Sequence, residues 1–244
     1  MRVAGHTYAY RGRPLEEALD ELAALGLELV EVWLGHAADG PDEVARALAE
    51  RNLQAVALSA GGFYDDRTTA PARAFELAAA VGAPVVVACV LPALLPAIAE
   101  RTPPGIELCV ENHWDQPLAT PRAVETALAG LPDIRACLDT GHAILAGVRP
   151  EDFVATLGDR LGHIHLKEAA ALTALDRLLG RRARRRLGRR PEPVFPGRGA
   201  LEPERLRRAL DRIGYCGAVT VEYEGPEPSA ALAALIRTLE RPGG

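Results

Sequence analysis

The sequence is poor in lysine and asparagine. It has one lysine, Lys167, among 28 basic residues, and two asparagines, Asn52 and Asn112. The remaining basic residues are arginines, a bias typical of a GC-rich genome that replaces lysine and asparagine wherever another residue serves. Positions that keep them are therefore informative. Lys167 and Asn112 both lie at the end of an apolar segment, and we expect a functional role for Lys167.

The chain also lacks long apolar runs. None approaches the ~20 residues that a membrane-spanning helix requires, and the N-terminal residues follow a strand pattern instead of a secretory signal. The net charge of −5 gives no general attraction to nucleic acid or to an anionic membrane. The cysteines show no paired metal-binding spacing, so we expect a cytoplasmic protein with reduced, buried thiols. They are Cys89, Cys109, Cys137 and Cys216.

Apolar strand patterns alternate with amphipathic helical patterns along the whole chain. The strand patterns cover 2–7, 28–33, 54–59, 84–90, 106–111, 134–139, 162–167 and 217–222. The helical patterns cover 14–25, 41–51, 69–81, 120–129, 150–157, 201–213 and 227–240, while prolines interrupt 91–100. Eight strand–helix units in ~250 residues predict an α/β fold, a single (β/α)8 TIM barrel over residues 1–244. An open doubly wound sheet is disfavoured because no glycine-rich phosphate turn follows the first strand pattern.

Four predicted strands end in a carboxylate or a histidine. These residues are Glu111, Asp139, His165 and Glu222. A parallel barrel gathers the carboxyl ends of its strands at one face, where the active sites of such folds lie. Three carboxylates and one imidazole suit a hard or borderline divalent cation. The pattern therefore predicts a metal site at that face.

Three of these ligand assignments have an alternative. Asp139 precedes Thr-Gly-His and could cap the following helix instead of binding a cation. Glu224 shares a strand face with Glu222, and His163 shares one with His165. We favour Glu222 and His165 as ligands because they lie nearer the predicted functional face, and we interpret His163 as a core group or a support for a ligand.

Several motifs carry a resemblance to a known family. They are CVENH at 109–113, LDTGH at 138–142, HIHLKE at 163–168, PGRGAL at 196–201 and VEYEG at 221–225. In this order and spacing they resemble the xylose isomerase-like barrel superfamily. That superfamily includes sugar-phosphate isomerases and epimerases, ketose 3-epimerases, inosose dehydratases and apurinic-site endonucleases, and the resemblance covers essentially the whole chain.

The resemblance implies roles for the residues that match. Glu111, Asp139, His165 and Glu222 would bind one divalent metal ion, which could be Mn²⁺, Mg²⁺, Co²⁺ or Zn²⁺. Glu111 and Glu222 would also act as the catalytic acid/base pair, and His142 would contact substrate. We expect Lys167 to orient or polarise the substrate. Further candidates for substrate contact are His6, Glu31, Trp33, His113, Trp114 and Arg198.

The expected activity is isomerisation or epimerisation of a small sugar, sugar phosphate or related polyhydroxy carbonyl compound through a metal-stabilised enediolate. Two alternatives stay open: a lyase of the inosose dehydratase type that uses the same site, and a barrel that binds a partner without catalysis. Pro117 and Ala171 stand where ketose 3-epimerases of free sugars carry a glutamate and an arginine. The expected partner is a small carbohydrate, without nucleic acid or membrane, and self-association into a homo-oligomer is left open.

A basic segment lies between the seventh strand pattern and the next helix, at roughly 169–199. It contains RRARRRLGRR at 181–190, with seven arginines. Arginine binds phosphate and carboxylate in a bidentate manner, so this insertion could clamp an anionic substrate. The alternative is a solvated surface helix with no ligand.

Overall fold

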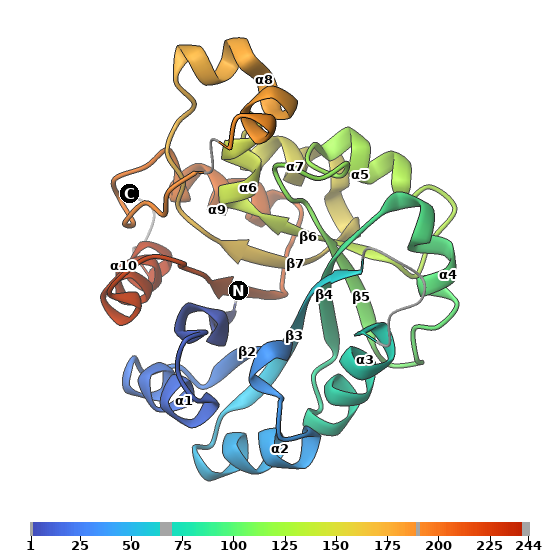
Figure 1. Cartoon of the computed structure of the whole chain (residues 1–244), viewed down its shortest axis with the longest axis vertical. Helices are drawn as coiled ribbons and strands as arrows, with labels where there is room; N and C mark the ends of the chain where they lie inside the picture. The colour runs from blue at the N-terminus through green and yellow to red at the C-terminus, as the bar shows by residue number, and fades with distance from the viewer. Residues whose placement is uncertain (1, 64–69, 189–190, 241–244) are drawn as a thin grey trace.

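The computed structural model describes residues 2–63, 70–188 and 191–240. Within these ranges eight parallel strands form a closed barrel in sequence order (Figure 1). The strands are β1 (Arg2–His6), β2 (Leu29–Trp33), β3 (Gln54–Phe63), β4 (Val85–Val90), β5 (Glu107–Glu111), β6 (Arg135–Asp139), β7 (Leu161–Leu166) and β8 (Ala218–Val221). The predicted (β/α)8 fold class is confirmed.

Helices connect the strands around the outside of the barrel. They are α1 (Leu15–Ala24), α2 (Pro41–Glu50), α3 (Ala70–Val81), α4 (Leu95–Ala99), α5 (Pro121–Ala127), α6 (Thr140–Leu145), α7 (Pro150–Leu157), α8 (Ala174–Arg186), α9 (Pro203–Arg212) and α10 (Pro228–Glu240). Proline occupies the first helical position of α2, α5, α7 and α9, where its missing N–H costs nothing. The segment 91–100, which prolines interrupt, forms a 3-10 turn at Pro92–Leu94 and the short α4, as its prolines predict.

Two elements differ from the sequence prediction. Strand β3 continues beyond the predicted end at residue 59 to Phe63, and its pairing with β4 shifts register between Ser59 and Gly62. The irregularity lets the glycine-containing end of the strand stay paired. Helix α6 was not predicted, because its six residues are too few to show a helical period.

The alternation of side chains along the strands creates two separate cores. The main apolar cluster lies between the barrel and the helices, with side chains such as Leu58, Leu108 and Ile164. Residues of the opposite strand faces point into the barrel, where Cys109 and Cys137 belong to a small cluster of their own. Because side chains repeat their face every second residue, the strand ends two positions beyond these cysteines also face inward. That parity places the functional candidates over the barrel interior.

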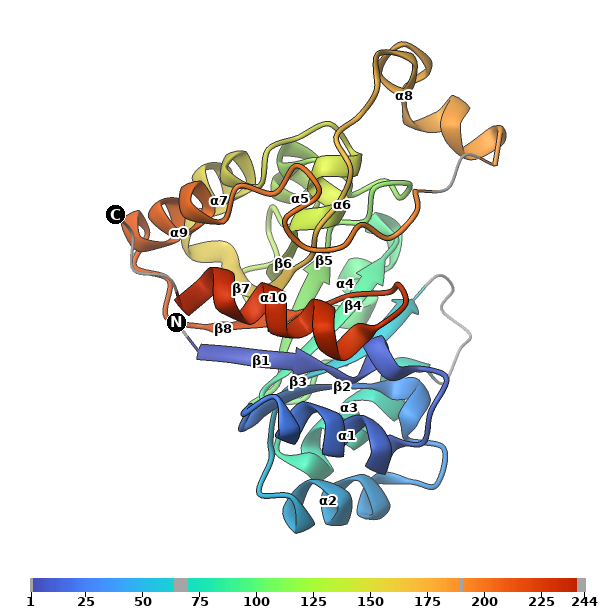
Figure 2. The same cartoon turned by 90° about the vertical axis from the view of Figure 1, so that its left-hand side faces the viewer.

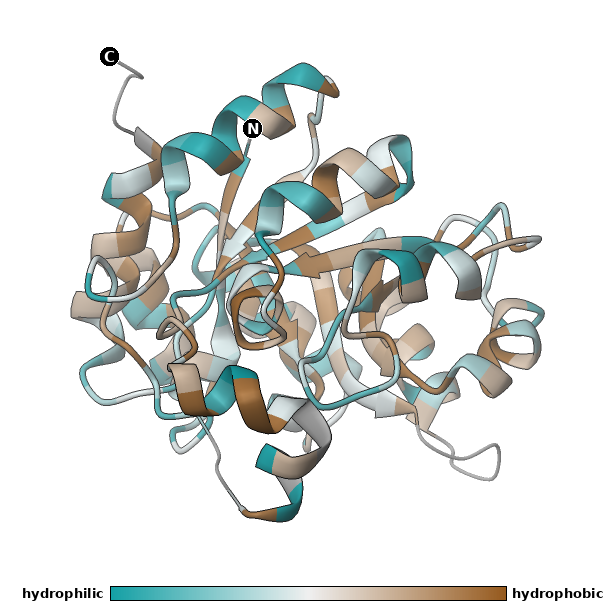
Figure 3. Ribbon diagram, turned by 90° about the horizontal axis from the view of Figure 1, so that it is seen from above, coloured by the Kyte–Doolittle hydropathy of each residue, from teal (hydrophilic) through white to brown (hydrophobic). Residues whose placement is uncertain are grey.

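Helix α8 stands apart from the ring of helices. It lies between β7 and α9 and projects from one end of the barrel (Figure 2). Gly180 interrupts it with φ of 67° and ψ of 170°. Leucines of this part of the chain are exposed, with Leu178 at 84%, whereas helices of the outer ring combine hydrophilic and hydrophobic faces (Figure 3).

The cysteine prediction is correct for three of four residues. Cys89, Cys109 and Cys137 are free and buried, but Cys216 is exposed because it lies in the turn before β8 and not in the strand. Among the described residues, no helix has the length and apolar character needed to cross a bilayer.

Candidate metal and substrate site

The structure brings the four predicted ligands together at the carboxyl ends of β5 to β8. Their donor atoms all lie within 4.8 Å of one another. Asp139 and His165 are direct partners in the β6–β7 register, which places them side by side. The side chains of Glu111, Asp139, His165 and Glu222 are 13%, 0%, 2% and 7% exposed. Such a concentration of buried ionisable groups is costly unless the groups serve one another or a ligand.

Asp139 combines both roles that the sequence left open. Its Oδ1 accepts a hydrogen bond of 2.6 Å from the backbone N–H of His142 and so caps α6. Its Oδ2 is buried without a hydrogen-bond partner, and Lys167 Nζ lies 3.8 Å away. Burial raises the pKa of Asp139 to about 8, and Lys167 opposes that rise. The oxygen without a donor is therefore free to accept a cation.

Asn112 holds the backbone that carries Asp139. Its Nδ2 donates to the backbone oxygen of Asp139 at 3.1 Å, and its Oδ1 accepts from the backbone N–H of Asp139 at 2.8 Å. Both partners are buried. This pair of hydrogen bonds ties the end of β5 to the end of β6, and it explains why one of the two asparagines of the chain stands here.

Glu111 and His165 face each other across the cluster. His165 Nδ1 lies 2.9 Å from Glu111 Oε1 and 3.2 Å from Glu222 Oε2. The Cys89 thiol donates to Glu111 Oε2 at 3.0 Å. Burial alone would raise the pKa of Glu111, but the hydrogen bond and the charge of His165, together with the hydrogen bond from Cys89, lower it below its ordinary value. Glu111 is thus held by donors on both of its oxygens.

Lys167 joins three carboxylates at the edge of the cluster. Its Nζ lies 2.8 Å from Glu222 Oε1 and 3.8 Å from Asp139 Oδ2, and it also bonds Glu224. Burial would lower the pKa of Lys167, but the carboxylates, Glu222 first, raise it well above the ordinary value. Burial likewise opposes ionisation of Glu222, and Lys167 lowers the pKa of Glu222 to about 2. Both groups are charged at neutral pH.

This environment predicts the reactivity of the single lysine. In the folded protein an amine-acylating reagent at about pH 8.5, above the usual α-amino pKa of ~7.7–8.0, should modify the terminal amine and leave Lys167 unmodified. Its raised pKa keeps the amine protonated and therefore unreactive, and its side chain, only 12% exposed, is poorly accessible to the reagent. Denaturant should expose a second site. Intact-mass spectrometry of both samples measures this difference, and rapid double labelling of the folded protein would contradict it.

Glu31 lies beneath the cluster and does not line the cavity. Its side chain is fully buried, and its oxygens lie 2.8 Å from His163 Nε2, 3.0 Å from His165 Nε2 and 3.5 Å from His6 Nε2. Burial opposes its charge, but His165, His163 and His6 lower the pKa of Glu31 well below its ordinary value. The sequence predicted substrate contact for Glu31; the structure places it behind the histidines, out of reach of substrate.

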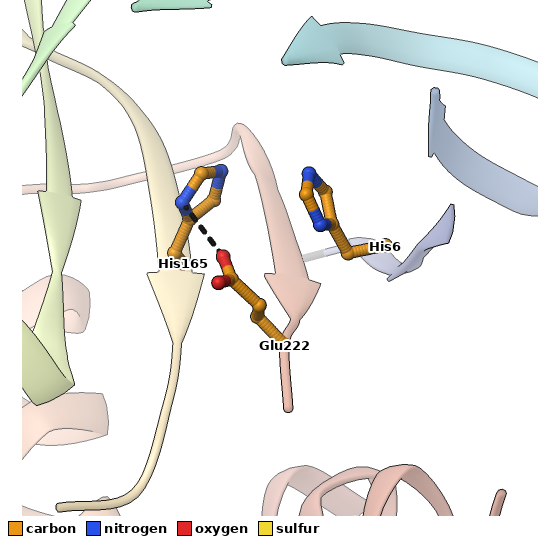
Figure 4. Close-up of side chains that lie close together, drawn as sticks. All are labelled: His6, His165 and Glu222. Atoms are coloured by element: carbon orange, nitrogen blue, oxygen red, sulfur yellow. Dashed lines mark ion pairs between the residues drawn. The ribbon is translucent and has the colours of Figure 1, made fainter. Parts of the chain in front are cut away.

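His6 approaches the cluster from the first strand of the barrel. Figure 4 shows its imidazole on β1 facing His165 and Glu222, which form an ion pair across the strand ends. The rings of His6 and His165 have centroids 5.4 Å apart. Both ring nitrogens of His6 are buried without a hydrogen-bond partner. Because Nε2 lies 3.5 Å from Glu31, Nδ1 is the ring nitrogen left to contact a substrate oxygen.

A cleft of two joined parts opens over these residues. The inner part, about 340 Å³, lies over the ends of β1 to β5, β7 and β8, and Glu111, His165 and Glu222 form part of its wall. The outer part, about 490 Å³, extends toward α6 and residues 191–194. The two parts share four lining residues: His113, His142, Lys167 and Glu224. Their combined size suits a small polar ligand.

Most of the other candidates line this cleft. Trp33 borders the inner part and Trp114 the outer part. His113 and His142 border both parts, with ring centroids 3.9 Å apart and ring planes tilted by 49°. Arg198 does not line either part. It is exposed and stacks on Phe195, with its guanidinium carbon 5.9 Å from the ring centroid, so the predicted anion contact of Arg198 does not reach the cleft in this structure.

Sequence analysis missed three functional candidates. Tyr8 and Cys89 line the inner part of the cleft. Cys89 could have been found from its position at the end of β4, two residues beyond the inward-facing Val87. Glu168 is buried, with 7% of its surface exposed. It accepts hydrogen bonds from the backbone N–H groups of Ala169, Gly197 and Leu201. No sequence pattern predicts that Glu168 accepts these hydrogen bonds, since two of the donors, Gly197 and Leu201, lie far along the chain.

Glu168 also explains a glycine of the PGRG motif. A Cβ at Gly199 would lie 2.3 Å from Glu168 Oε1 and 2.4 Å from the backbone oxygen of Ala169. Glycine is therefore required for the loop to pack on the end of β7. Glu168 and Ala169 both line the outer part of the cleft, so the close approach of Gly199 is to the wall of that part.

One arginine of the arginine-rich segment, Arg184, contacts the barrel near the cleft. Arg184 is 5% exposed, stacks over Trp114 at 5.2 Å from the ring centroid, and donates to the backbone oxygen of Leu145 at 2.5 Å. It anchors α8 to the barrel. The side chains of Arg181, Arg182 and Arg185, and residues 189–190, lie outside the described residues, so the arginine clamp stays a prediction.

The donor set fits a divalent cation. Glu111, Asp139 and Glu222 offer carboxylate oxygens, His165 offers Nδ1, and the buried Oδ2 of Asp139 has no other partner. Oxygen donors with one imidazole accept Mn²⁺, Mg²⁺, Co²⁺ or Zn²⁺. The lining of the cleft leaves room beside these donors for a substrate.

The fold and this cluster define a (β/α)8 barrel with a carboxylate–histidine centre at the carboxyl ends of its strands. Residues 19–241 match the model of the family described as xylose isomerase-like TIM barrel, and the chain belongs to that family. No curated protein matches the sequence.

Solved structures of the same fold extend over nearly the whole chain. The probable 3-DHS dehydratase AsbF of Bacillus anthracis, involved in petrobactin synthesis, is 15% identical over 99% of both chains, with a TM-score of 0.76. D-allulose 3-epimerase of Methylomonas sp. is 16% identical over 98% of this chain and 97% of that chain, with a TM-score of 0.76. The 3-keto-D-glucoside 4-epimerase YcjR of E. coli is 17% identical over 98% of both, with a TM-score of 0.72.

Proposed function

We propose that the protein is a divalent-metal-dependent isomerase or epimerase of a small sugar, sugar phosphate or related polyhydroxy carbonyl compound. The observation that carries the proposal is the buried Asp139 Oδ2, which has no donor of its own among the donor atoms of Glu111, His165 and Glu222. Buried carboxylate oxygens normally have a partner. A cation held by these four residues would supply it.

Glu111 and Glu222 would move the proton. Both carboxylates contact the same nitrogen, His165 Nδ1, at 2.9 and 3.2 Å, so they border one space from two sides. A bound cation would stabilise the negative charge that develops on the substrate oxygens as the proton leaves the adjacent carbon. One ionised carboxylate takes that proton, and the other can return one to the opposite face, which inverts the carbon. Return to the neighbouring carbon would instead give an isomer.

Lys167 and the histidines would orient the substrate. Lys167, in contact with Glu222, keeps this carboxylate ionised at neutral pH. His6 and His142 present buried ring nitrogens without hydrogen-bond partners in the cleft. Hydroxyl groups of a sugar could satisfy them.

A lyase is the second candidate. AsbF, titled a probable 3-DHS dehydratase, matches this chain from end to end. Elimination of a β-hydroxyl would follow the same proton abstraction, so the same carboxylates serve either outcome. The non-catalytic alternative is disfavoured, because a barrel that only binds a partner has no need for four buried ligand groups in one cluster. A cytoplasmic location and a homo-oligomer stay predictions.

Titration of Mn²⁺ into metal-stripped protein tests the centre. We expect one site per chain, lost in Glu111→Gln because that variant removes an anionic ligand. Glu107→Gln is the matched control: Glu107 begins the same strand and pairs with Arg135 at the opposite end of the barrel. Folded wild-type protein that binds no Mn²⁺, or an equal loss in both variants, would contradict the proposal.

Incubation with candidate substrates in D₂O then identifies the reaction. Epimerisation or isomerisation through proton transfer to carboxylates should incorporate solvent deuterium at carbon, followed by mass spectrometry and NMR. A lyase should instead produce an unsaturated carbonyl compound with a new ultraviolet absorbance. If Mn²⁺-loaded protein gives neither signal with free and phosphorylated ketoses and inososes, the result would favour a non-catalytic role.

A further inference from the structure

A single buried carboxylate lies at the centre of the histidines below the metal cluster. Glu31 is fully buried, and its two oxygens are approached by the Nε2 atoms of His163, His165 and His6 at 2.8, 3.0 and 3.5 Å. His163 also contacts Thr220 Oγ1 at 2.9 Å. A buried charge without partners would cost several kcal/mol. His163 and His165 therefore direct N–H groups at Glu31, whereas His6 lies farther away and makes no hydrogen bond to it.

His165 lies within hydrogen-bond distance of Glu31 on one side and of the metal cluster on the other. Its Nε2 lies 3.0 and 3.1 Å from the two oxygens of Glu31, while its Nδ1 lies 2.9 Å from Glu111 and 3.2 Å from Glu222. An ionised carboxylate accepts hydrogen bonds and cannot donate them. An imidazole that binds a cation through one nitrogen carries its single N–H on the other. The nitrogen of His165 that faces the cluster must therefore give up its proton to bind a cation, while the nitrogen that faces Glu31 keeps its own.

We propose, on the basis of the proposed metal site, that Glu31 is a positioning residue that holds the proton of His165 on Nε2 and so presents the Nδ1 lone pair to the cation. A ligating histidine needs a free lone pair on one nitrogen and a partner for the N–H of the other. Glu31 supplies that partner with both of its oxygens. Its complete burial prevents water from taking over this role.

The other two histidines keep the carboxylate in place. His163, also bonded to Thr220, contacts one oxygen of Glu31 from strand β7, and His6 approaches the other oxygen from β1. Glu31 itself is on β2 and pairs with His6 in the β1–β2 register. Residues of β1, β2 and β7 thus fix the position of the carboxylate, and the carboxylate in turn fixes the orientation of the His165 ring.

Nuclear magnetic resonance of the imidazoles tests the proposal without a metal-dependent reaction. Long-range ¹H–¹⁵N spectra distinguish protonated, unprotonated and metal-bound ring nitrogens, and a His165→Gln variant assigns the signals. We expect a protonated Nε2 of His165 in the metal-free protein and in the Zn²⁺-loaded protein, with Zn²⁺ shifting only Nδ1. An unprotonated Nε2, or a Zn²⁺ shift at Nε2, would overturn the proposal.

Mn²⁺ affinity provides the second measurement. Loss of a carboxylate that orients a ligating histidine typically weakens metal binding by ~10–100-fold, and we expect a loss of this size in Glu31→Gln. The control is Thr220→Val, which removes a buried polar group of the same network without touching the ring of His165. It should bind Mn²⁺ as wild type does. Circular dichroism checks that both variants fold.

The two measurements separate the inference from the function on which it rests. Wild-type protein that binds no Mn²⁺ would contradict the proposed function. Wild-type binding with equal affinity in a folded Glu31→Gln variant would leave the function standing and overturn the role of Glu31. If Glu31→Gln does not fold, the imidazole spectra of wild-type protein still decide the inference.

Discussion

Replacement of Asp139 by asparagine should abolish Mn²⁺ binding and, at the same time, stabilise the metal-free protein at alkaline pH. The variant keeps an oxygen that can accept from the backbone N–H of His142 and cap α6. It removes the second, unpartnered carboxylate oxygen, whose burial raises the pKa of Asp139 to about 8. In the absence of the cation, the ionised form of Asp139 therefore lowers the free energy of unfolding.

The pH dependence follows from proton binding. The pKa of Asp139 is raised from 3.8 to about 8 in the folded state, so the folded protein binds more protons than the unfolded chain between these values. Stability contributed by this group is complete below 3.8 and is lost as pH rises toward 8. The amide of the Asp139→Asn variant does not titrate in this range, so the variant lacks that loss. Its melting temperature should exceed that of wild type by at least ~2 °C near pH 8, with the difference vanishing near pH 4.

Mn²⁺ should reverse the order of stability. A ligand that binds only the folded state stabilises it in proportion to the logarithm of its concentration over Kd, so wild type should gain stability and Asp139→Asn should not. Asp152→Asn is the control, since Asp152 bonds Arg149 at the exposed start of α7. Melting curves with and without Mn²⁺ measure the effect. A metal-free variant that is less stable than wild type near pH 8 would contradict the assigned pKa shift.

Replacement of Lys167 by methionine should give the largest loss of stability among single charge removals at the site. Lys167 bonds Glu222 and Glu224 and faces Asp139, and its side chain is 12% exposed. Removing one member of a buried ion pair typically costs ~3–5 kcal/mol, because the remaining charge is left uncompensated. We expect a decrease of about 3 kcal/mol in the free energy of unfolding near neutral pH, with loss of any activity.

The loss should diminish in acid. In wild type Lys167 opposes burial and lowers the pKa of Glu222 from 4.5 to about 2, so the stabilisation is complete above 4.5 and fades as pH falls toward 2. Urea unfolding at about pH 7 and about pH 4 measures both values. Arg51→Met is the control: Arg51 pairs with the exposed Asp20, and such pairs contribute at most ~1 kcal/mol. Equal losses in the two variants would contradict the buried pair.

The sequence was sufficient to predict the barrel because the signal is periodic and local. Each strand pattern is a short apolar run, and the prolines at the starts of α2 and α5 mark helices without reference to any distant residue. The gathering of Asp139 and His165 could also be predicted, since parallel strands of a barrel bring their carboxyl ends to one face. Helix α6 escaped prediction because its six residues show no period.

The role of Glu31 could not be read from its own strand. Its pattern shows a carboxylate in an apolar segment, which is equally consistent with substrate contact. Only the closure of β1 onto β8 brings β7 and its histidines near β2. The same holds for Glu168, whose partners Gly197 and Leu201 follow it by 29 and 33 residues in the sequence. Contacts between segments distant in sequence carry no periodic signal.

The amino-acid sequence by itself determined the fold class, the order of its elements and the identity of the four residues that meet at the strand ends. Those properties depend on apolar period and strand polarity, which are local. Tertiary structure decided which oxygen of Asp139 is left without a donor, that Glu31 lies behind His165, and that Lys167 holds Glu222. Burial and charge pairing decide such matters, and both exist only once the barrel has closed.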